Sequence, residues 1–452
     1  MLPEVHIYID RSEAETWNHD EIDNLQGKIN TGEYSMSKVI IIGGGAAGMM
    51  AGVFAARNHH EVHILEKNEK LGKKVFITGK GRCNVTNNCE VEELLRAVMT
   101  NSKFLYSAFY TFNSQDMMAL LEEAGVPLKT ERGNRVFPES DRSSDIIRGL
   151  ERLMKKYGVH VRFKSEVREI LTQDGAAVGV SLADGEIKRA DAVVVATGGL
   201  SYPTTGSTGD GYRFARETGH QVTDCIPSLV PLKTREDYIP RMAGLSLKNV
   251  ELTVRRGKKI LYRDFGEMMF THTGVTGPLI LSASARLGKY LVKGEELTAF
   301  IDLKPALSLE QLDERILREF ENGKNKQFKN VIGVLFPSSL TPVMLEIGGI
   351  PGDKVIHEIS REERLAFGMT VKNFPFTITE PGEFKEAVIT QGGVSVRDIN
   401  PGSMESKKIK NLYFTGEVLD LDAVTGGYNL QIAWSTAYLA AMDISEKSYC
   451  EQ

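Results

Sequence analysis

The segment from Lys38 to Glu66 constrains the fold more than any other part of the chain. Residues 38–42 form a short β-branched run, typical of a strand buried on both faces, and they lead directly into Gly43-Gly44-Gly45-Ala46-Ala47-Gly48. This turn fits the pattern GxGxxG, and a helical stretch (49–57) and a second apolar strand (61–66) follow it. The order strand, glycine turn, helix, strand predicts a dinucleotide-binding Rossmann unit and therefore an α/β fold.

The glycine turn predicts where a dinucleotide would lie. Gly43 permits the tight turn, Gly45 lets backbone N–H groups approach a pyrophosphate, and Gly48 lets the helix pack closely on the strand. The helix N-terminus adds partial positive charge beside the phosphates. Glu66 ends the second strand and would accept hydrogen bonds from ribose hydroxyls, which disfavours NADP at this site. The alternative is a glycine-rich turn without a ligand.

Composition limits the class of protein. The 452 residues are 41% apolar and 25% charged with a net charge of −5, so we expect a globular chain of up to about three domains and no global attraction to nucleic acid or membranes. Glycine is in excess, at 43 residues against a usual ~7%. Four scattered cysteines without a CxxC pair predict a reducing, cytoplasmic location and no metal site.

Two segments need separate interpretation. Residues 1–35 are acidic and hold no signal-peptide core, and we interpret them as an N-terminal arm without a function. Residues 39–56 carry no charge and are about as long as a membrane-spanning helix. Their glycines and the Rossmann pattern favour a buried strand, a turn and a helix instead. We therefore expect no membrane association.

Later glycine clusters favour FAD over NAD. Residues 73–84 read as a basic loop, and residues 192–199 read as a buried strand that breaks at Gly198 and Gly199. Residues 411–417 repeat this pattern, and Gly426-Gly427-Tyr428-Asn429 opens a helix predicted from Leu430 to about Met442. A second helix N-terminus is what a flavin needs beside its N1/C2 carbonyl, where it stabilises the anion of the reduced ring.

Six ordered segments resemble one known family: GGGAAG (43–48), GKGRCN (79–84), ATGG (196–199), FTHTGVTGP (270–278), TGE (415–417) and TGGYN (425–429). Together, from Met36 to the C-terminus, they resemble the HI0933-like family of FAD-dependent oxidoreductases. The resemblance implies bound FAD in a discontinuous Rossmann-like domain of the glutathione-reductase type. It does not fix the substrate, because relatives resemble reductases or dehydrogenases of unsaturated ring ketones and amine oxidases.

The resemblance also assigns the cofactor to positions in this chain. The pyrophosphate would lie at the first glycine turn, the adenosine near Thr197 and Gly198, and the ribityl chain at Gly416 and Glu417. The predicted FAD-binding residues are Gly43, Gly45, Ala46, Ala47, Gly48, Glu66, Lys67, Lys74, Gly81, Arg82, Cys83, Asn84, Val167, Thr197, Gly198, Gly416, Glu417, Gly426, Gly427, Tyr428, Asn429 and Leu430.

The expected domains are an FAD-binding domain in two parts, 36–227 and 392–452, and an insert at 228–391 that is β-rich and then helical. Two hairpin strands (248–256, 258–264), a strand (296–303) and two helices (308–322, 354–369) are predicted within the insert. It would roof the flavin and admit a small-molecule substrate. His272 is the first candidate for acid–base catalysis because histidine titrates near neutrality, with Arg82 and Tyr428 as weaker candidates.

The predicted function is two-electron hydride transfer through FAD, with NAD(P)H as a transient reductant because the chain holds no second GxGxxG. One alternative is a thiol–disulfide reductase that uses Cys83 and Cys89. Another is a non-catalytic FAD-binding sensor or an RNA-associated flavoprotein. The basic turn at 255–259 has no interleaved aromatic residues, so a solvated surface explains it better than RNA binding.

Overall fold

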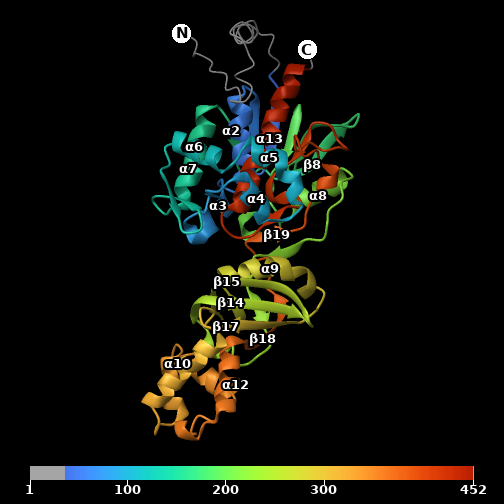
Figure 1. Ribbon diagram of the computed structural model, residues 1–452. Helices are drawn as coiled ribbons and strands as arrows, with labels where there is room; N and C mark the ends of the chain where they lie inside the picture. The colour runs from blue at the N-terminus through green and yellow to red at the C-terminus, as the bar shows by residue number, and fades with distance from the viewer. Residues whose placement is uncertain (1–35, 451–452) are drawn as a thin grey trace.

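A computed structural model describes residues 36–450, so the predicted N-terminal arm lies outside the described residues. Figure 1 shows an upper body that contains both described ends of the chain and a lower body that carries β14, β15, α10 and α12. No helix in the described range is long and apolar enough to cross a membrane.

The upper body is built on a five-stranded parallel sheet in the order β20-β11-β1-β2-β7. Its central strand is β1 (Lys38–Ile42), where Ile40 and Ile41 are fully buried, as the β-branched run predicts. The other strands are β2 (Glu61–Leu65), β7 (His160–Arg162), β11 (Ala192–Val195) and β20 (Leu412–Phe414). The Rossmann-type α/β fold expected from the sequence is therefore present, and its last strand comes from the far end of the chain.

Helices pack around this sheet and join the two chain segments. Helix α2 (Ala46–Arg57) packs against α13 (Tyr428–Cys450) and α7 (Ser143–Lys156), and Figure 1 shows α2 beside α13. One continuous apolar core includes residues of all three helices. The remaining helices of the upper body are α3 (Lys73–Ile77), α4 (Val91–Ala97), α5 (Tyr106–Thr111), α6 (Ser114–Glu123) and α8 (Asp210–Glu217).

Four small sheets complete the upper body and its junction with the insert. Strand β12 pairs antiparallel with β19, and these two strands flank the insert on its way out and back. The strands of these sheets are β3 (Thr86–Asn87), β4 (Val98–Thr100), β5 (Leu128–Glu131), β6 (Arg135–Pro138), β8 (Val167–Gln173), β9 (Ala176–Leu182), β10 (Ile187–Arg189), β12 (Ile226–Ser228), β19 (Ile389–Gln391) and β21 (Asp422–Ala423).

The insert contains a closed barrel in the order β13-β16-β15-β14-β17-β18. Its strands are β13 (Leu232–Thr234), β14 (Ser246–Arg256), β15 (Lys259–Phe270), β16 (Gly274–Thr276), β17 (Leu297–Asp302) and β18 (Phe374–Pro381). The predicted hairpin is present with longer arms. The first and last strands of the barrel pair with each other although more than a hundred residues separate them.

Helix α9 (Pro278–Leu291) follows β16, and α10 (Leu309–Asn322), α11 (Thr341–Ile347) and α12 (Arg361–Lys372) precede β18. The chain therefore returns to the barrel after the helices, instead of ending the insert on them. Capping boxes start α10 at Ser308 and α12 at Ser360. The second cap corrects the predicted helix 354–369, because Ser360 binds the N–H of Glu363 and fixes the helix start there.

The basic segment at residues 73–84 corrects another expectation. It was predicted as a loop, whereas residues 73–77 form α3 and residues 78–81 form a 3-10 turn. Val75 is buried while Phe76 and Ile77 are exposed, and the Ser143 hydroxyl on α7 donates to the Phe76 carbonyl, so this short helix is held on the body by both apolar and polar contacts. Two consecutive left-handed residues, Gly79 and Lys80, then end the helical segment.

Candidate functional site

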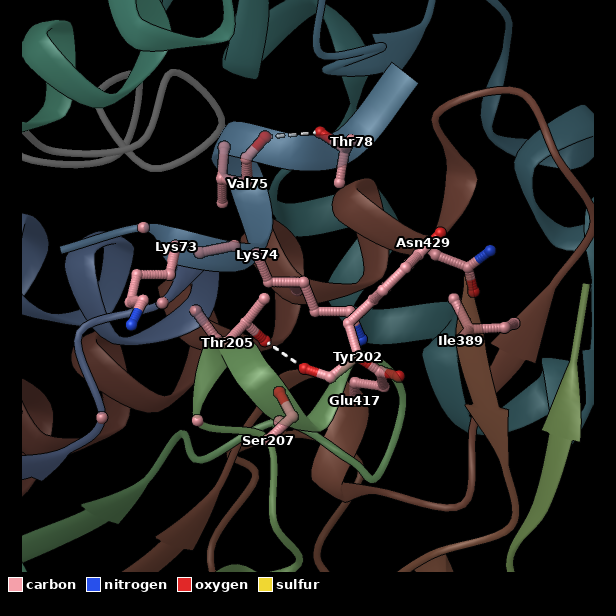
Figure 2. Close-up of a pocket in the computed structure, with 18 of the residues that line it drawn as sticks. Lys73, Lys74, Val75, Thr78, Tyr202, Thr205, Ser207, Ile389, Glu417 and Asn429 are labelled. Atoms are coloured by element: carbon pink, nitrogen blue, oxygen red, sulfur yellow. Dashed lines mark hydrogen bonds and ion pairs between the residues drawn. The ribbon is translucent and has the colours of Figure 1, made fainter. Parts of the chain in front are cut away.

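A cavity of about 780 Å³ lies at the carboxyl ends of the parallel strands. Its lining includes Gly43 after β1, Glu66 after β2, Thr197 after β11 and Thr415 after β20. Figure 2 shows side chains from α3, from the segment after β11 and from the C-terminal part meeting around it. In open parallel sheets, ligands bind at this edge, where connections leave in opposite directions.

The first glycine turn fits a close approach of backbone to ligand. Gly43 has φ +102°, and a Cβ there would lie 2.7 Å from the Ala196 carbonyl oxygen. At Gly48 a Cβ would lie 1.8 Å from the Gly43 carbonyl oxygen, so the helix needs glycine to pack on the turn. Gly45, by contrast, faces open space and begins α2. The turn therefore packs tightly against protein at Gly43 and Gly48 and leaves open space at Gly45, which lines the cavity.

Glu66 is buried and held by three N–H donors. The Gly44 N–H donates to Oε2 at 2.7 Å, and the backbone and side-chain N–H groups of Asn68 donate to Oε1 at 2.8 and 2.7 Å. An ionised carboxylate offers about four acceptor positions, so one stays free for a ribose hydroxyl. The same bonds fix the carboxylate at the cavity edge.

An ion pair lies in the cavity lining between segments that are distant in sequence. Lys74 Nζ on α3 lies 2.5 Å from Glu417 Oε2, and Lys74 also donates to the Ser201 hydroxyl. Glu417 Oε1 accepts from the Ser201 hydroxyl at 2.7 Å and from the Thr390 N–H at 2.8 Å. Because Thr390 lies in β19, this network links the cofactor side of the cavity to the return strand of the insert.

The second glycine cluster places a helix N-terminus at the cavity. Gly426, Gly427, Asn429 and Leu430 line it at the start of α13. Gly427 has φ +96°, and a Cβ there would lie 2.4 Å from the Thr86 carbonyl oxygen, so no other residue fits. Asn429 fixes the preceding turn, because its side chain accepts from the Ala423 N–H and donates to the Ala423 carbonyl.

Three buried polar atoms at the cavity have no hydrogen-bond partner within the described residues: Asn84 Oδ1, Thr197 Oγ1 and Thr415 Oγ1. A buried polar group without a partner costs about 1–3 kcal/mol, so such atoms mark places where a ligand supplies the partner. The two glycine turns, the ribose acceptor and these three atoms fit an extended dinucleotide such as FAD.

Most of the predicted FAD-binding residues meet at this cavity. Those that line it are Gly43, Gly45, Ala46, Ala47, Glu66, Lys67, Lys74, Asn84, Val167, Thr197, Gly198, Glu417, Gly426, Gly427, Asn429 and Leu430. Gly48, Gly81, Arg82, Cys83, Gly416 and Tyr428 do not line it. Gly48 serves helix packing, and a Cβ on Gly416 would lie 2.9 Å from the Cβ of Ala47.

Arg82 is engaged elsewhere. It donates to Glu131 and Asp141, each 2.5 Å away, and its guanidinium lies 4.2 Å from the centre of the Phe137 ring. These contacts hold it on the β5–β6 side of the upper body. Arg82 therefore braces the segment that carries Asn84 instead of facing the cavity.

The two other catalytic candidates also lie off the cavity lining. His272 is exposed in the turn between β15 and β16. Since β13 and β16 pair antiparallel, the cavity-lining residues Pro231 and Thr276 lie at the end of these strands opposite that turn. Tyr428 starts α13, and burial raises its pKa to about 12, with Cys89 and Glu93 adding to the effect. Neither residue is placed to touch a molecule in the cavity.

The thiols also differ from a redox pair. Cys83 is buried, and burial raises its pKa to about 11. Burial, with Glu93 and Glu90, raises the pKa of Cys89 to about 12. Both are therefore protonated at neutral pH, neither lines the cavity, and both are free cysteines. These features argue against the thiol–disulfide alternative.

Some lining residues were missed from the sequence. Tyr202 and Thr276 are polar, and Leu229, Pro231, Leu281, Val388 and Ile389 form an apolar side of the cavity. Tyr202 comes from the loop after β11, Thr276 from β16 and Leu281 from α9. Leu229 and Pro231 lie in the linker between β12 and β13, Val388 lies in the linker between β18 and β19, and Ile389 begins β19. Their meeting depends on how the insert docks, which no local pattern records. Of these residues, only Thr276 lies in a segment that carries the family resemblance, residues 270–278.

Comparison with known proteins identifies relatives of the chain. The model of the HI0933-like protein Rossmann domain matches residues 37–443. A 3-dehydro-bile acid delta(4,6)-reductase of Clostridium scindens is 30% identical over 91% of this chain and 100% of its own length. A ribosomal RNA dihydrouridine synthase of Haemophilus influenzae is 31% identical over 91% of this chain and 99% of its own length.

Among solved structures, a 3-ketosteroid delta1-dehydrogenase of Sterolibacterium denitrificans superposes with a TM-score of 0.52. It is 12% identical and covers 91% of this chain and 100% of its own, so the likeness concerns the fold alone. The family model, by contrast, spans both parts of the cavity lining and the insert between them. The chain belongs to the HI0933-like family of FAD-dependent oxidoreductases.

Proposed function

We propose that the chain uses FAD to reduce a carbon–carbon double bond conjugated with a ring carbonyl in a small organic molecule, with NADH or NADPH as the source of electrons. The observation that carries this proposal is the composition of the cavity. The phosphate-binding turn and Glu66 lie among its lining, and so does the apolar group of Leu229, Pro231, Leu281, Val388 and Ile389. A dinucleotide and a flat, largely apolar ring can share such a site.

The chain's own residues have distinct tasks in this proposal. The N–H groups at the start of α2 bind the pyrophosphate, and the N-terminus of α13 presents positive potential to the flavin ring. Bound FAD would supply two-electron hydride transfer to an acceptor at this place. The apolar residues before β13 and β19 and on α9 would exclude water from the acceptor.

The names of both relatives support the type of acceptor. One acts on delta(4,6) bonds of a 3-dehydro-bile acid, and the other makes dihydrouridine, so each saturates a carbon–carbon double bond near a carbonyl. GxGxxG occurs once in the sequence, so NADH or NADPH would reach the flavin without a Rossmann site of its own.

A second candidate acceptor is uridine in RNA. The Haemophilus influenzae relative is named for ribosomal RNA, and three lysines near α3 (Lys70, Lys73 and Lys80) line the cavity. Positive side chains at the entrance would attract a phosphate backbone while the base enters. We favour the small molecule for two reasons. A net charge of −5 gives the chain no overall attraction for RNA, and the apolar lining can hold a small ring without contacts to a phosphate backbone.

The test uses the FAD-loaded protein under anaerobic conditions. NADH and NADPH are compared as reductants, and the reduced protein is then mixed with 4-androstene-3,17-dione, a 3-oxo-4,6-diene bile acid or uridine-containing RNA. Return of the oxidised flavin spectrum with either ring ketone supports the proposal. Reoxidation by the RNA alone would replace it with the second candidate, and reoxidation by none of the three would overturn both.

A further inference from the structure

Tyr202 has an unusual position in the cavity. It is the one tyrosine that lines the cavity within residues 36–450, and Figure 2 shows its side chain among those of Lys74, Glu417 and Asn429. The residue is half-buried, and no described residue forms a hydrogen bond with its hydroxyl. A free phenolic O–H therefore faces the space in which a ligand would lie.

The backbone of Tyr202 is strained. Its φ of 50° and ψ of 63° lie in the left-handed region, which bulky residues rarely adopt. Pro203 follows, and a residue before proline is normally pushed toward extended conformations. Such a conformation is unfavourable and persists only where the surroundings enforce it. Strain of this kind is concentrated at functional sites.

Hydrogen bonds from two directions enforce the strain. The Tyr202 carbonyl accepts from the Thr205 N–H at 2.8 Å and from the Thr205 hydroxyl at 2.7 Å. The Tyr202 N–H donates to the Phe384 carbonyl at 3.0 Å, on the linker that returns from the barrel. The preceding Ser201 bonds to Glu417 and, through its N–H, to Thr390. Tyr202 is thus fixed by the linker that also supplies apolar lining residues.

Several charged side chains at the cavity are already engaged. Lys74 is paired with Glu417, and Lys67 is paired with Asp210. Glu66 accepts hydrogen bonds from three N–H groups. A phenol is a stronger hydrogen-bond donor than the alcohols of Thr276 and Ser207, which also line the cavity. Tyr202 is therefore the strongest free neutral donor in this lining.

We propose that the Tyr202 hydroxyl binds the carbonyl oxygen of the substrate and stabilises the negative charge that develops there during reduction. This inference rests on the proposed function and names the residue that selects a carbonyl-bearing substrate. It makes Tyr202 a catalytic residue and gives the conjugated carbonyl, rather than the double bond alone, the role of the recognised group.

The chemical step is balanced without further reagents. Hydride from the reduced cofactor adds to the carbon distal to the carbonyl, the carbon–carbon double bond breaks, and its electron pair moves to the carbonyl oxygen. The Tyr202 O–H holds this oxyanion by a hydrogen bond. A proton from water then adds to the carbon next to the carbonyl, and the carbonyl re-forms. The acceptor gains two electrons and two hydrogens, and the cofactor loses the same two electrons.

The test compares Tyr202→Phe with the wild-type holoprotein, because this change removes one oxygen and keeps the ring. With the acceptor that reoxidises the wild type, kcat should fall about 10²–10³-fold, as when one oxyanion donor is lost. The saturated ketone 5α-androstane-3,17-dione should bind to the variant about tenfold more weakly than to the wild type. Its binding is measured by the change it causes in the flavin spectrum. FAD content and the melting temperature should not change. Tyr106→Phe, an exposed tyrosine on α5, is the matched control.

Several results would overturn the inference. An unchanged kcat and an unchanged affinity for the ketone in Tyr202→Phe would show that the hydroxyl does not touch the substrate. Loss of FAD from the variant would assign Tyr202 to the cofactor instead. The wild type gives an independent check, since 5α-androstane, which lacks both carbonyls, must bind more weakly than the dione. If no acceptor reoxidises the wild type but the dione binding still depends on Tyr202, the proposed function fails and the carbonyl site stands.

Discussion

Lys74 Nζ lies 2.5 Å from Glu417 Oε2, although 343 positions separate the two residues in the chain. The pair joins α3, at the start of the chain, to the segment after β20, near its end. Both side chains are about one-fifth exposed, so water screens the pair only in part. Because Glu417 also accepts from Thr390 and Ser201, its carboxylate connects α3, the loop after β11 and the return strand of the insert.

The first prediction concerns this pair. Glu417→Gln leaves the Lys74 charge without its partner, so we expect weaker retention of FAD and a lower melting temperature. A double-mutant cycle with Lys74→Met should give a coupling free energy of about 1–3 kcal/mol. Lys233 and Glu380 form an exposed pair of the same type on the barrel, and Glu380→Gln should leave both properties unchanged. Additive effects of Glu417→Gln and Lys74→Met would contradict the predicted coupling.

The second prediction separates two glycines of the first turn. Gly48→Ala forces a Cβ to within 1.8 Å of the Gly43 carbonyl oxygen, so it should lower the free energy of unfolding by about 1–3 kcal/mol and reduce FAD binding. Gly45→Ala meets no protein atom within 4 Å and should keep the melting temperature. Its methyl group enters the space in which we propose that the pyrophosphate binds, so FAD affinity should still fall. Thermal unfolding and the FAD-to-protein ratio measure the two effects.

Gly333→Ala is the control for this pair of variants, because it adds a methyl group in open space on the insert and should change neither property. If Gly45→Ala retained wild-type affinity for FAD, the pyrophosphate would not lie at the start of α2. If it lost FAD only together with a lower melting temperature, the effect would be on folding.

The third prediction is a pH dependence of stability from Asp422 in β21. Burial raises the pKa of its carboxyl to about 6, against opposing hydrogen bonds from Thr100 and Gln391. The folded state therefore binds the proton of Asp422 more tightly than the unfolded state does. This tighter binding stabilises the fold fully at pH values below the pKa of the unfolded state, and the stabilisation is lost as the pH rises through about 6. The loss amounts to about 3 kcal/mol at most.

Asp422→Asn removes that titration, so the variant should melt above the wild type at pH values of about 8 and close to it at about 4. Melting curves across this range measure the difference. Asp353→Asn, at an exposed carboxyl of the insert, should follow the wild-type curve. A parallel shift of the Asp422→Asn curve at all pH values would show that Asp422 does not titrate in the folded protein.

The fourth prediction concerns the thiols. Cys83→Ser and Cys89→Ser, singly and together, should keep flavin turnover, because both thiols are protonated at neutral pH and lie off the cavity lining. Turnover is measured with the acceptor found for the wild type, and FAD content shows that the site is intact. Loss of turnover in either variant with full FAD content would restore the thiol–disulfide mechanism.

The sequence predicted the local parts of this structure well. The βαβ unit at 38–66, the strand before Gly198 and the helix after Gly427 all have strong short-range patterns, and the structure contains each of them. The α3 segment was missed because a five-residue helix gives too few periodic positions. The closed barrel was missed because β13 pairs with β18 across the whole insert, and such pairing leaves no local signature.

In the candidate site, too, local backbone requirements were predictable from the sequence, whereas the placement of side chains by distant residues was not. Glycine turns can be recognised from sequence because only glycine fits their backbone, as at Gly43 and Gly427. Arg82 was predicted at the flavin because of its neighbours in a motif, yet Glu131 and Asp141 hold it on another surface. Tyr202 reaches the cavity through a left-handed turn that precedes a proline, a conformation that sequence statistics disfavour. Its place in the cavity lining depends on backbone hydrogen bonds with Phe384 and Thr205.

The most direct test of the proposed chemistry is a single turnover. Holoprotein reduced by one equivalent of dithionite under anaerobic conditions is mixed with one equivalent of 4-androstene-3,17-dione, and the flavin spectrum and the mass of the steroid are recorded. We predict full return of the oxidised spectrum and a steroid that has gained two hydrogen atoms. A flavin that stays reduced until oxygen enters, with the steroid unchanged, would contradict the proposed reduction of a conjugated ring ketone.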